Sequence, residues 1–206
     1  MIRSIAKLSQ KLTQTSARYS YYATLSSIPP QIDEILKIAD KLESTGESKL
    51  FIKPFGCWLG VSREEVIQEK GKPRYVVKGV WKDLETIIYK QKSKSIETII
   101  QLHFFKGRLF FVKSDFSSII MSIKELNQLI YTSVCKKYQN LKPDDSFHHL
   151  MLKDKRNGQL LLVSEGFFSS IYYFNDSIET KELFKRLRTK KEDTSGTSRT
   201  SLSHLV

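Results

Sequence analysis

Two adjacent segments constrain the fold of this chain most strongly, because their residue types and spacing predict a β-hairpin. Glu97–Phe105 and Arg108–Phe116 are rich in β-branched and aromatic side chains, and only Lys106-Gly107 separates them. A short connection that contains glycine allows the backbone angles that a tight hairpin turn requires. The chain is therefore expected to contain antiparallel β-structure at its centre.

Five more segments with a similar composition are predicted to be strands: Arg74–Trp81, Thr86–Lys90, His148–Lys153, Gln159–Ser164 and Ser169–Phe174. Asn157-Gly158 lies directly before the fourth of these segments. This dipeptide is typical of a type I′ turn, since both of its residues tolerate positive φ angles. The sequence therefore predicts a second hairpin around it.

A short helix is predicted directly after residue 62. Ser62 and Glu65 have the spacing of a capping box, in which the serine hydroxyl accepts a backbone N–H bond and the glutamate bonds back to the serine N–H. Gly71 suits the C-terminal end because it tolerates positive φ, and Pro73 prevents the helix from continuing. Both ends of this helix are therefore marked in the sequence.

Three further helices are predicted from capping residues and apolar periodicity. Ser122 and Glu125 form a second capping box, and apolar residues recur nearby at helical spacing: Ile119, Ile123, Leu126, Ile130 and Val134. This helix is expected to end near Tyr138. Similar patterns predict one helix over about residues 31–43 and a final helix that begins at residue 176 or 177.

The order of these elements is helix, strands, helix, strands, helix, which predicts an α+β fold with helices packed on an antiparallel β-sheet. A capped helix twice leads through a proline-containing turn into a meander, so a division into two helix-plus-meander halves stays open. We expect residues 31–188 to form a single domain. Residues 1–30 are expected to be a separate basic segment, and the Ser/Thr-rich residues 189–206 a disordered tail.

The N-terminal segment is basic and contains no acidic residue before Asp33. Arg3, Lys7 and Lys11 share one face of a predicted helix, and apolar residues occupy the opposite face: Ile2, Ile5, Leu8 and Leu12. Residues 1–27 resemble a mitochondrial targeting segment, whereas an ordinary amphipathic helix or a flexible tail is the alternative. An intracellular location is expected, because no continuous apolar stretch of a secretory signal is present.

The net charge of +12 raises the question of an anionic partner. Six basic residues gather on the predicted final helix: Lys181, Lys185, Arg186, Arg188, Lys190 and Lys191. They are candidates for contact with an anion or with the phosphates of a nucleic acid. The alternative is that they only interact favourably with the C-terminal end of the helix dipole.

Residues for catalysis or for metal binding do not form a recognisable pattern. Cys57 and Cys135 lie in apolar surroundings and are predicted to be buried, and no Cys-x-x-Cys motif accompanies them. His103 lies within a strand and is expected to have a packing role or to lie at the surface. No glycine-rich phosphate loop and no apolar stretch of membrane-spanning length occur. We therefore predict no enzyme activity, no cofactor and no transmembrane segment.

Residues 106–113 partly match a motif of RNA-recognition domains. The motif requires aromatic or small residues where this chain has Arg108, Leu109 and Lys113. Base stacking in such domains depends on those positions. A buried hairpin with a basic turn is therefore the preferred interpretation.

A short signature resembles a known family. Phe55-Gly56, Gly60-Val61-Ser62, Glu64-Glu65-Val66 and Gly71-Lys72-Pro73 follow the pattern of small bacterial envelope domains of the SmpA/OmlA (BamE) type. They also resemble the related folds that are similar to the β-lactamase inhibitor protein. The resemblance implies a helical segment packed on an antiparallel sheet and a role in binding or assembling other proteins. We therefore expect a non-catalytic protein-binding or assembly module, with a basic nucleic-acid-binding protein as the alternative.

Overall fold

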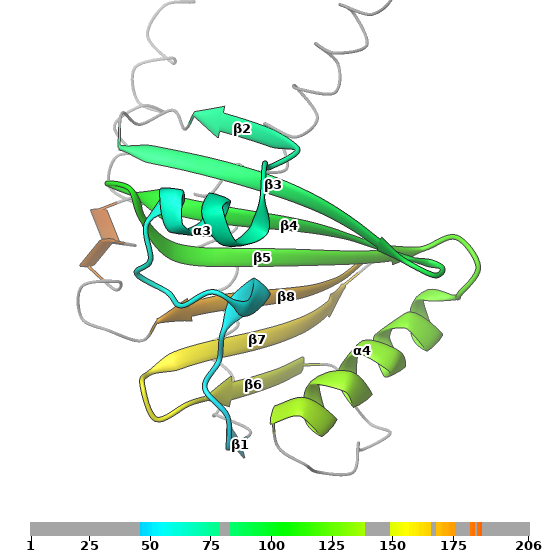
Figure 1. The fold of residues 1–206 in the computed structure, drawn as a ribbon. Helices are drawn as coiled ribbons and strands as arrows, with labels where there is room; N and C mark the ends of the chain where they lie inside the picture. The colour runs from blue at the N-terminus through cyan, green and yellow to red at the C-terminus, as the bar shows by residue number, and fades with distance from the viewer. Residues whose placement is uncertain are drawn as a thin grey trace, which may run out of the picture.

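The structure is a computed structural model that describes residues 46–78, 83–138, 149–165, 168–175, 182–183 and 185–186. Within these ranges, eight strands form one sheet in the order β1-β6-β7-β8-β5-β4-β3-β2 (Figure 1). The strands are β1 (Gly46–Glu47), β2 (Tyr75–Lys78), β3 (Leu84–Ser93), β4 (Ile96–Phe105), β5 (Arg108–Ser118), β6 (His149–Lys153), β7 (Gly158–Glu165) and β8 (Phe168–Asn175). The helices are the short 3-10 helix η1 (Pro54–Gly56), α3 (Arg63–Lys70) and α4 (Ile123–Tyr138).

Helices and an antiparallel sheet are both present, so the predicted α+β class is confirmed at this level. All strand pairs are antiparallel except β1 with β6, which run parallel. The predicted helix over residues 31–43, the segments 1–30 and 189–206, and the start of the predicted final helix all lie outside the described residues.

Helix α3 begins and ends where the sequence predicts. The Ser62 hydroxyl accepts a hydrogen bond from the backbone N–H of Glu65, and the Glu65 carboxylate accepts one from the N–H of Ser62 at 2.6 Å. The bond from the Ser62 N–H, and secondarily the Ser62 hydroxyl, lower the pKa of the Glu65 carboxyl, because both stabilise its charged form. Gly71 ends the helix with φ 80°, a positive backbone angle that glycine adopts without strain.

The predicted β4–β5 hairpin is also confirmed. Lys106 and Gly107 both have positive φ, and Phe105 pairs directly with Arg108. Beyond the turn, His103 pairs with Phe111 and Phe104 with Leu109, so Phe110 is an extra residue in β5. This β-bulge changes the direction of the strand locally.

The predicted type I′ turn at Asn157-Gly158 is wrong, although the β6–β7 hairpin exists. Asn157 has φ 60°, but Gly158 is not among the residues with positive φ, as a type I′ turn would require. The Asp154 carboxylate replaces that geometry by accepting hydrogen bonds from the N–H groups of Ile52 at 2.6 Å, Arg156 at 2.7 Å and Gly158 at 2.9 Å. One buried side chain therefore shapes the turn and attaches residue 52 to it.

Two large apolar clusters lie on the same face of the sheet. One contains Val66 of α3 and Cys57 together with residues of β3, β4 and β5. The other contains six side chains of α4 with residues of β6, β7 and β8: Leu126, Ile130, Tyr131, Val134, Cys135 and Tyr138. The prediction that both cysteines are buried is confirmed, and burial raises the pKa of each thiol.

The predicted apolar stripe of α4 is correct only from Leu126 onward. Leu126, Ile130 and Val134 are buried, whereas Ile119 is 92% exposed and Ile123 is 36% exposed. The reason is that residue 119 precedes the helix, which begins only at Ile123. A periodic pattern in the sequence therefore continued beyond the helix itself.

Replacing Asp154 should destabilise the domain strongly. Asp154→Ala leaves three backbone N–H groups without their acceptor, and two of these bonds are buried. We expect a loss of about 2–4 kcal/mol in the free energy of unfolding, measured by urea denaturation. Asp83→Ala, at an exposed aspartate, is the matched control and should change stability by less than about 0.5 kcal/mol. Equal effects of the two substitutions would contradict this role of Asp154.

Candidate functional site

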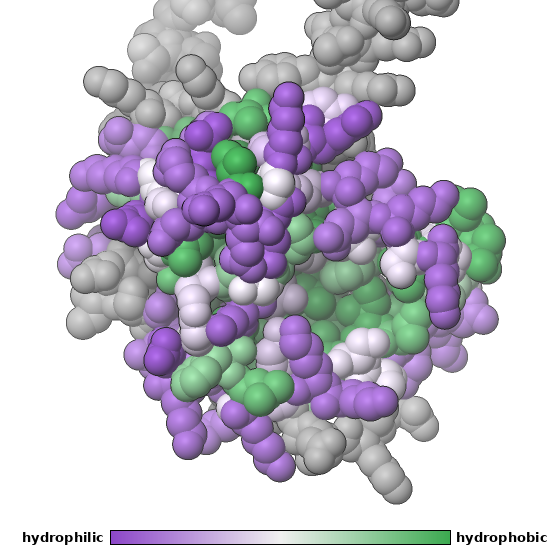
Figure 2. Space-filling view, in the orientation of Figure 1, coloured by the Kyte–Doolittle hydropathy of each residue, from purple (hydrophilic) through white to green (hydrophobic). Residues whose placement is uncertain are grey.

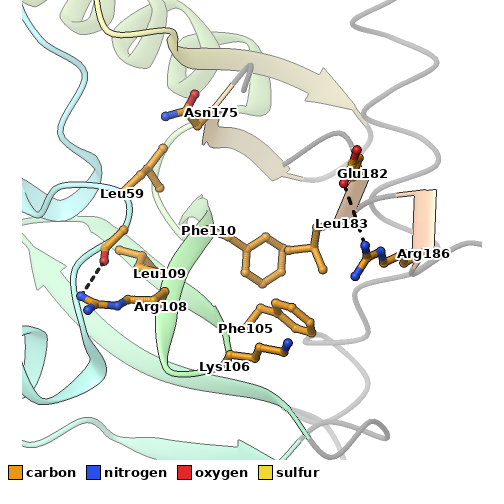
Figure 3. Close-up of a pocket in the computed structure, with 11 residues that line it drawn as sticks. Leu59, Phe105, Lys106, Arg108, Leu109, Phe110, Asn175, Glu182, Leu183 and Arg186 are labelled. Atoms are coloured by element: carbon orange, nitrogen blue, oxygen red, sulfur yellow. Dashed lines mark hydrogen bonds and ion pairs between the residues drawn. The ribbon is translucent and has the colours of Figure 1, made fainter. Parts of the chain in front are cut away.

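A cleft of about 460 Å³ opens at the end of the sheet that carries the β4–β5 turn. Four parts of the chain line it: the loop after η1, the β4–β5 turn, the last residue of β8, and residues 182, 183 and 186. Figure 3 shows their side chains around one space. Strand register explains why Asn175 lies near the β4–β5 turn. Strands β5 and β8 are paired, and Asn175 follows Phe174, the residue that pairs with Phe111.

The floor of the cleft is apolar. Phe110 and Leu183 belong to one buried cluster, and the partly buried Phe105 packs against that cluster. In Figure 3, Phe110 points toward Leu183, and Phe105 lies beside both. Leu59 and Leu109 complete the apolar lining. The bulge at Phe110 matters here, since it interrupts the regular alternation of side chains along β5.

Three cations and one carboxylate surround this floor. Arg108 donates a hydrogen bond from Nη1 to the carbonyl oxygen of Gly60 at 3.2 Å, which links the hairpin turn to the loop after η1. Arg186 lies 3.9 Å from Glu182, and both side chains are more than half exposed, so solvent weakens this ion pair. Lys106 lies with Nζ 5.6 Å from the centre of the Phe105 ring. The lining therefore carries a positive net charge.

A second depression of about 240 Å³ adjoins the cleft and shares Leu59 and Asn175 with it. The side-chain oxygen Oδ1 of Asn175 is buried, and no described residue donates a hydrogen bond to it. A buried acceptor of this kind is uncommon in folded proteins, and a ligand donor could satisfy it. The Oδ1 atom of Asn175 is therefore a candidate acceptor for a hydrogen bond from a bound ligand.

Cations and aromatic rings stack beside the second depression. The rings of Phe51 and Trp58 have centres 5.6 Å apart. The Arg156 guanidinium lies 4.6 Å from the centre of Phe51 and 4.7 Å from that of Trp58, and Lys53 Nζ lies 4.0 Å from Trp58. These distances are within the range of cation–π attraction. The stack extends the basic surface from the β4–β5 turn to the β6–β7 turn.

The predicted basic cluster is only partly described. Lys185 and Arg186 are helical and exposed, and Arg186 lines the cleft. Lys181, Arg188, Lys190 and Lys191 lie outside the described residues. Sequence reasoning did not place Lys106, Arg108 and Arg156 in a site. The sequence did carry one signal for this grouping, because basic residues occupy both predicted hairpin turns. The strand register places these two turns at the same end of the sheet.

A row of polar side chains crosses β3, β4, β5 and β8 on the face opposite the two apolar clusters. The register places Thr86 beside His103, Gln101 beside Lys113, and Asp115 beside Ser170. Asp115 accepts hydrogen bonds from Ser170 at 2.6 Å and Gln101 at 3.2 Å, and lies 3.1 Å from Lys113 Nζ. One carboxylate thus joins side chains of three strands.

His103 of this row is fully buried, with Nδ1 2.8 Å from the Thr86 hydroxyl. Burial, and secondarily the nearby charge of Lys113, lowers its pKa to about 3. The ring is therefore neutral at physiological pH. Its Nε2 and the Oε1 atom of Gln101 are buried, and neither has a hydrogen-bond partner among the described residues. The prediction of a packing role agrees with this burial, whereas a surface position is wrong.

Among the described residues, no three His, Cys, Asp or Glu side chains gather where they could hold a metal ion. No helix of the described part of the chain is long and apolar enough to cross a membrane. Comparisons of this chain with protein-family models, with curated proteins and with solved structures found no match.

The buried His103 should make stability depend on pH. An unfolded histidine titrates near pH 6.5, but this ring accepts its proton only near pH 3 in the folded state. As pH falls from 6.5 toward 3, the unfolded state gains a proton that the folded state lacks, and stability declines by up to about 1.4 kcal/mol per pH unit. His103→Asn can keep the bond to Thr86 and removes the titration.

Urea denaturation of both proteins at several pH values between 7 and 4 should therefore show the shallower decline in the variant. Carboxylates also titrate in this range, but they contribute equally to the two proteins. Parallel curves for wild type and His103→Asn would show that the imidazole is protonated normally in the folded state.

Proposed function

We propose that this domain is a non-catalytic protein-binding or assembly module. Its cleft at the β4–β5 turn would receive an extended segment of a partner protein, with an apolar side chain on the floor and acidic residues near the rim. The observation that carries this proposal is the combination of an apolar floor with a surplus of positive charge around it. The volume of about 460 Å³ is large enough to receive a few side chains.

Each part of the lining supports a different part of this recognition. Phe105, Phe110 and Leu183 offer apolar surface, whose burial provides most of the affinity in protein association. Lys106, Arg108 and Arg186 exceed the single carboxylate of Glu182, so acidic partner residues would be attracted and correctly oriented. The unpaired Oδ1 of Asn175 could accept a backbone N–H of the bound segment.

Nucleic acid is the second candidate, because the basic surface includes the aromatic residues Phe51 and Trp58. Proteins that bind single strands offer open aromatic faces on which bases stack. Here Trp58 already has Lys53 and Arg156 over its ring, and Arg156 also lies over Phe51. A base would have to displace these cations, so we rank a peptide segment above a nucleic acid.

We also propose that the domain consists of two helix-plus-meander halves whose helices pack on the sheet. In support of this division, α3 precedes β2–β5 and α4 precedes β6–β8, and the two strand groups adjoin at the β5–β8 pair. The resemblance to BamE-type domains stays a prediction. A binding role agrees with that resemblance but is argued from the cleft alone.

Selection of peptides by the purified chain would test the proposed function. Enriched peptides should combine one aliphatic or aromatic residue with neighbouring acidic residues. Their dissociation constants, measured by fluorescence anisotropy, should rise at least about tenfold in the double variant Lys106→Glu and Arg186→Glu, since attraction becomes repulsion. Leu59→Asn should also weaken binding, because it makes the apolar lining polar.

The double variant Lys49→Glu and Lys72→Glu is the matched control. It makes the same change in net charge at exposed residues that do not line the cleft, and it should bind like wild type. Equal weakening by both double variants would contradict a specific site. Displacement of the peptide by single-stranded oligonucleotides, with a steep salt dependence, would favour the nucleic-acid alternative.

A further inference from the structure

The turn between β5 and α4 exposes two adjacent isoleucines. Ile119 is 92% exposed and Ile120 is 73% exposed, the two largest values among the exposed large hydrophobic residues of the described chain. Single exposed apolar residues are common at protein surfaces, but a neighbouring pair at the tip of a turn is a feature that needs an explanation. Hydration of both side chains is unfavourable unless something covers them.

Local hydrogen bonds hold the backbone of this turn. The Ser118 hydroxyl accepts from the N–H groups of Ile120 at 3.3 Å and Met121 at 3.2 Å. The next residue, Ser122, donates its N–H to the Glu125 carboxylate at 2.8 Å and so anchors the start of α4. Hydrogen bonds therefore fix the backbone that carries the two isoleucines, between the end of a strand and the start of a capped helix.

A basic turn lies beside the isoleucines. Ser93 pairs with Ile96, and Ile96 pairs with Ser118, so the β3–β4 turn and the β5–α4 turn lie at the same end of the sheet. Figure 1 places both turns at the end of the sheet far from the β4–β5 turn. Figure 2 shows hydrophobic surface at this end with hydrophilic side chains around it.

The charge at this end is positive. Lys92 and Lys94 of the β3–β4 turn region and Lys124 of α4 are exposed. The acidic residues of the same region have other partners, since Glu97 forms an ion pair with Lys90 at 2.8 Å and Glu125 caps α4. At this end of the described part of the chain, the three exposed lysines therefore lie on the elements that flank the isoleucines, and both acidic residues named here are engaged elsewhere.

We propose that this corner, made of Ile119 and Ile120 with Lys92, Lys94 and Lys124, docks on an anionic lipid surface. The lysines attract the negative headgroups, and the two isoleucines insert into the apolar layer beneath them. Lysine is a compact point charge on a long stem, which suits headgroups that have no fixed geometry. This surface lies at the opposite end of the sheet from the cleft, and the proposal does not depend on the proposed function.

The geometry favours lipid over a second copy of the chain. A stable protein interface buries roughly 800 Å² on each partner, far more than two isoleucine side chains provide. A projecting apolar tip also lacks the complementary hollow that a second copy would need to offer at a symmetric contact. Insertion into a lipid layer requires no such hollow.

Vesicle sedimentation with the full chain tests the proposal. Wild type should bind vesicles of phosphatidylglycerol and phosphatidylcholine, bind phosphatidylcholine alone weakly, and lose affinity as salt rises. The double variant Ile119→Asp and Ile120→Asp should bind the mixed vesicles at least about tenfold more weakly, because two charges replace the inserting side chains. Leu50→Asp, at a residue that is 53% exposed elsewhere, is the control and should bind like wild type.

Two further variants distinguish the insertion of the isoleucines from the electrostatic attraction of the lysines. Ile120→Trp should bind normally and show stronger fluorescence quenching by brominated lipids than wild type. The double variant Lys94→Glu and Lys124→Glu should weaken binding to mixed vesicles and leave the weak binding to phosphatidylcholine unchanged. The proposal is overturned if wild type binds no vesicles or if the aspartate variant binds as wild type does. A dimer that dissociates in the aspartate variant, without vesicle binding, would instead identify an interface between copies.

Discussion

The pairing of β5 with β8 is the contact on which the rest of the structure depends. It joins strands from two distant parts of the chain, with Phe111 opposite Phe174 at one end and Phe116 opposite Ser169 at the other. Without it, the described chain would contain two separate groups of strands, β2–β5 on one side and β1 with β6–β8 on the other. The pairing brings Asn175 to the β4–β5 turn, and it also places Ser170 within hydrogen-bond distance of Asp115.

Local elements could be predicted from the sequence because their causes are local. The capping box of Ser62 and Glu65 and the Lys106-Gly107 turn need only residues that are close along the chain. The turn at Asn157 was predicted incorrectly because the Asp154 carboxylate accepts bonds from the N–H groups of Arg156, Gly158 and Ile52, and Ile52 is remote in sequence. The apolar stripe predicted for α4 began too early in the chain, since periodicity alone does not show where a helix begins.

The candidate sites depend on contacts that no local pattern reveals. Arg186 was predicted as part of a basic cluster, but its place in the same cleft as Lys106 and Arg108 follows only from the arrangement of the folded chain. The polar row was also hidden in the sequence, because Gln101, Asp115 and Ser170 belong to three different strands. Alternation within each strand was visible, whereas the register between strands was not.

The length of β5 has a consequence for how the two proposed surfaces relate. Its eleven residues span about 35 Å between the turn at Arg108 and the turn after Ser118. This separation is several times the screening length of about 8 Å at physiological salt, so charges at one end barely influence the other. The two surfaces can therefore be occupied at the same time and altered one at a time, and the hairpin acts as a spacer of defined length between them.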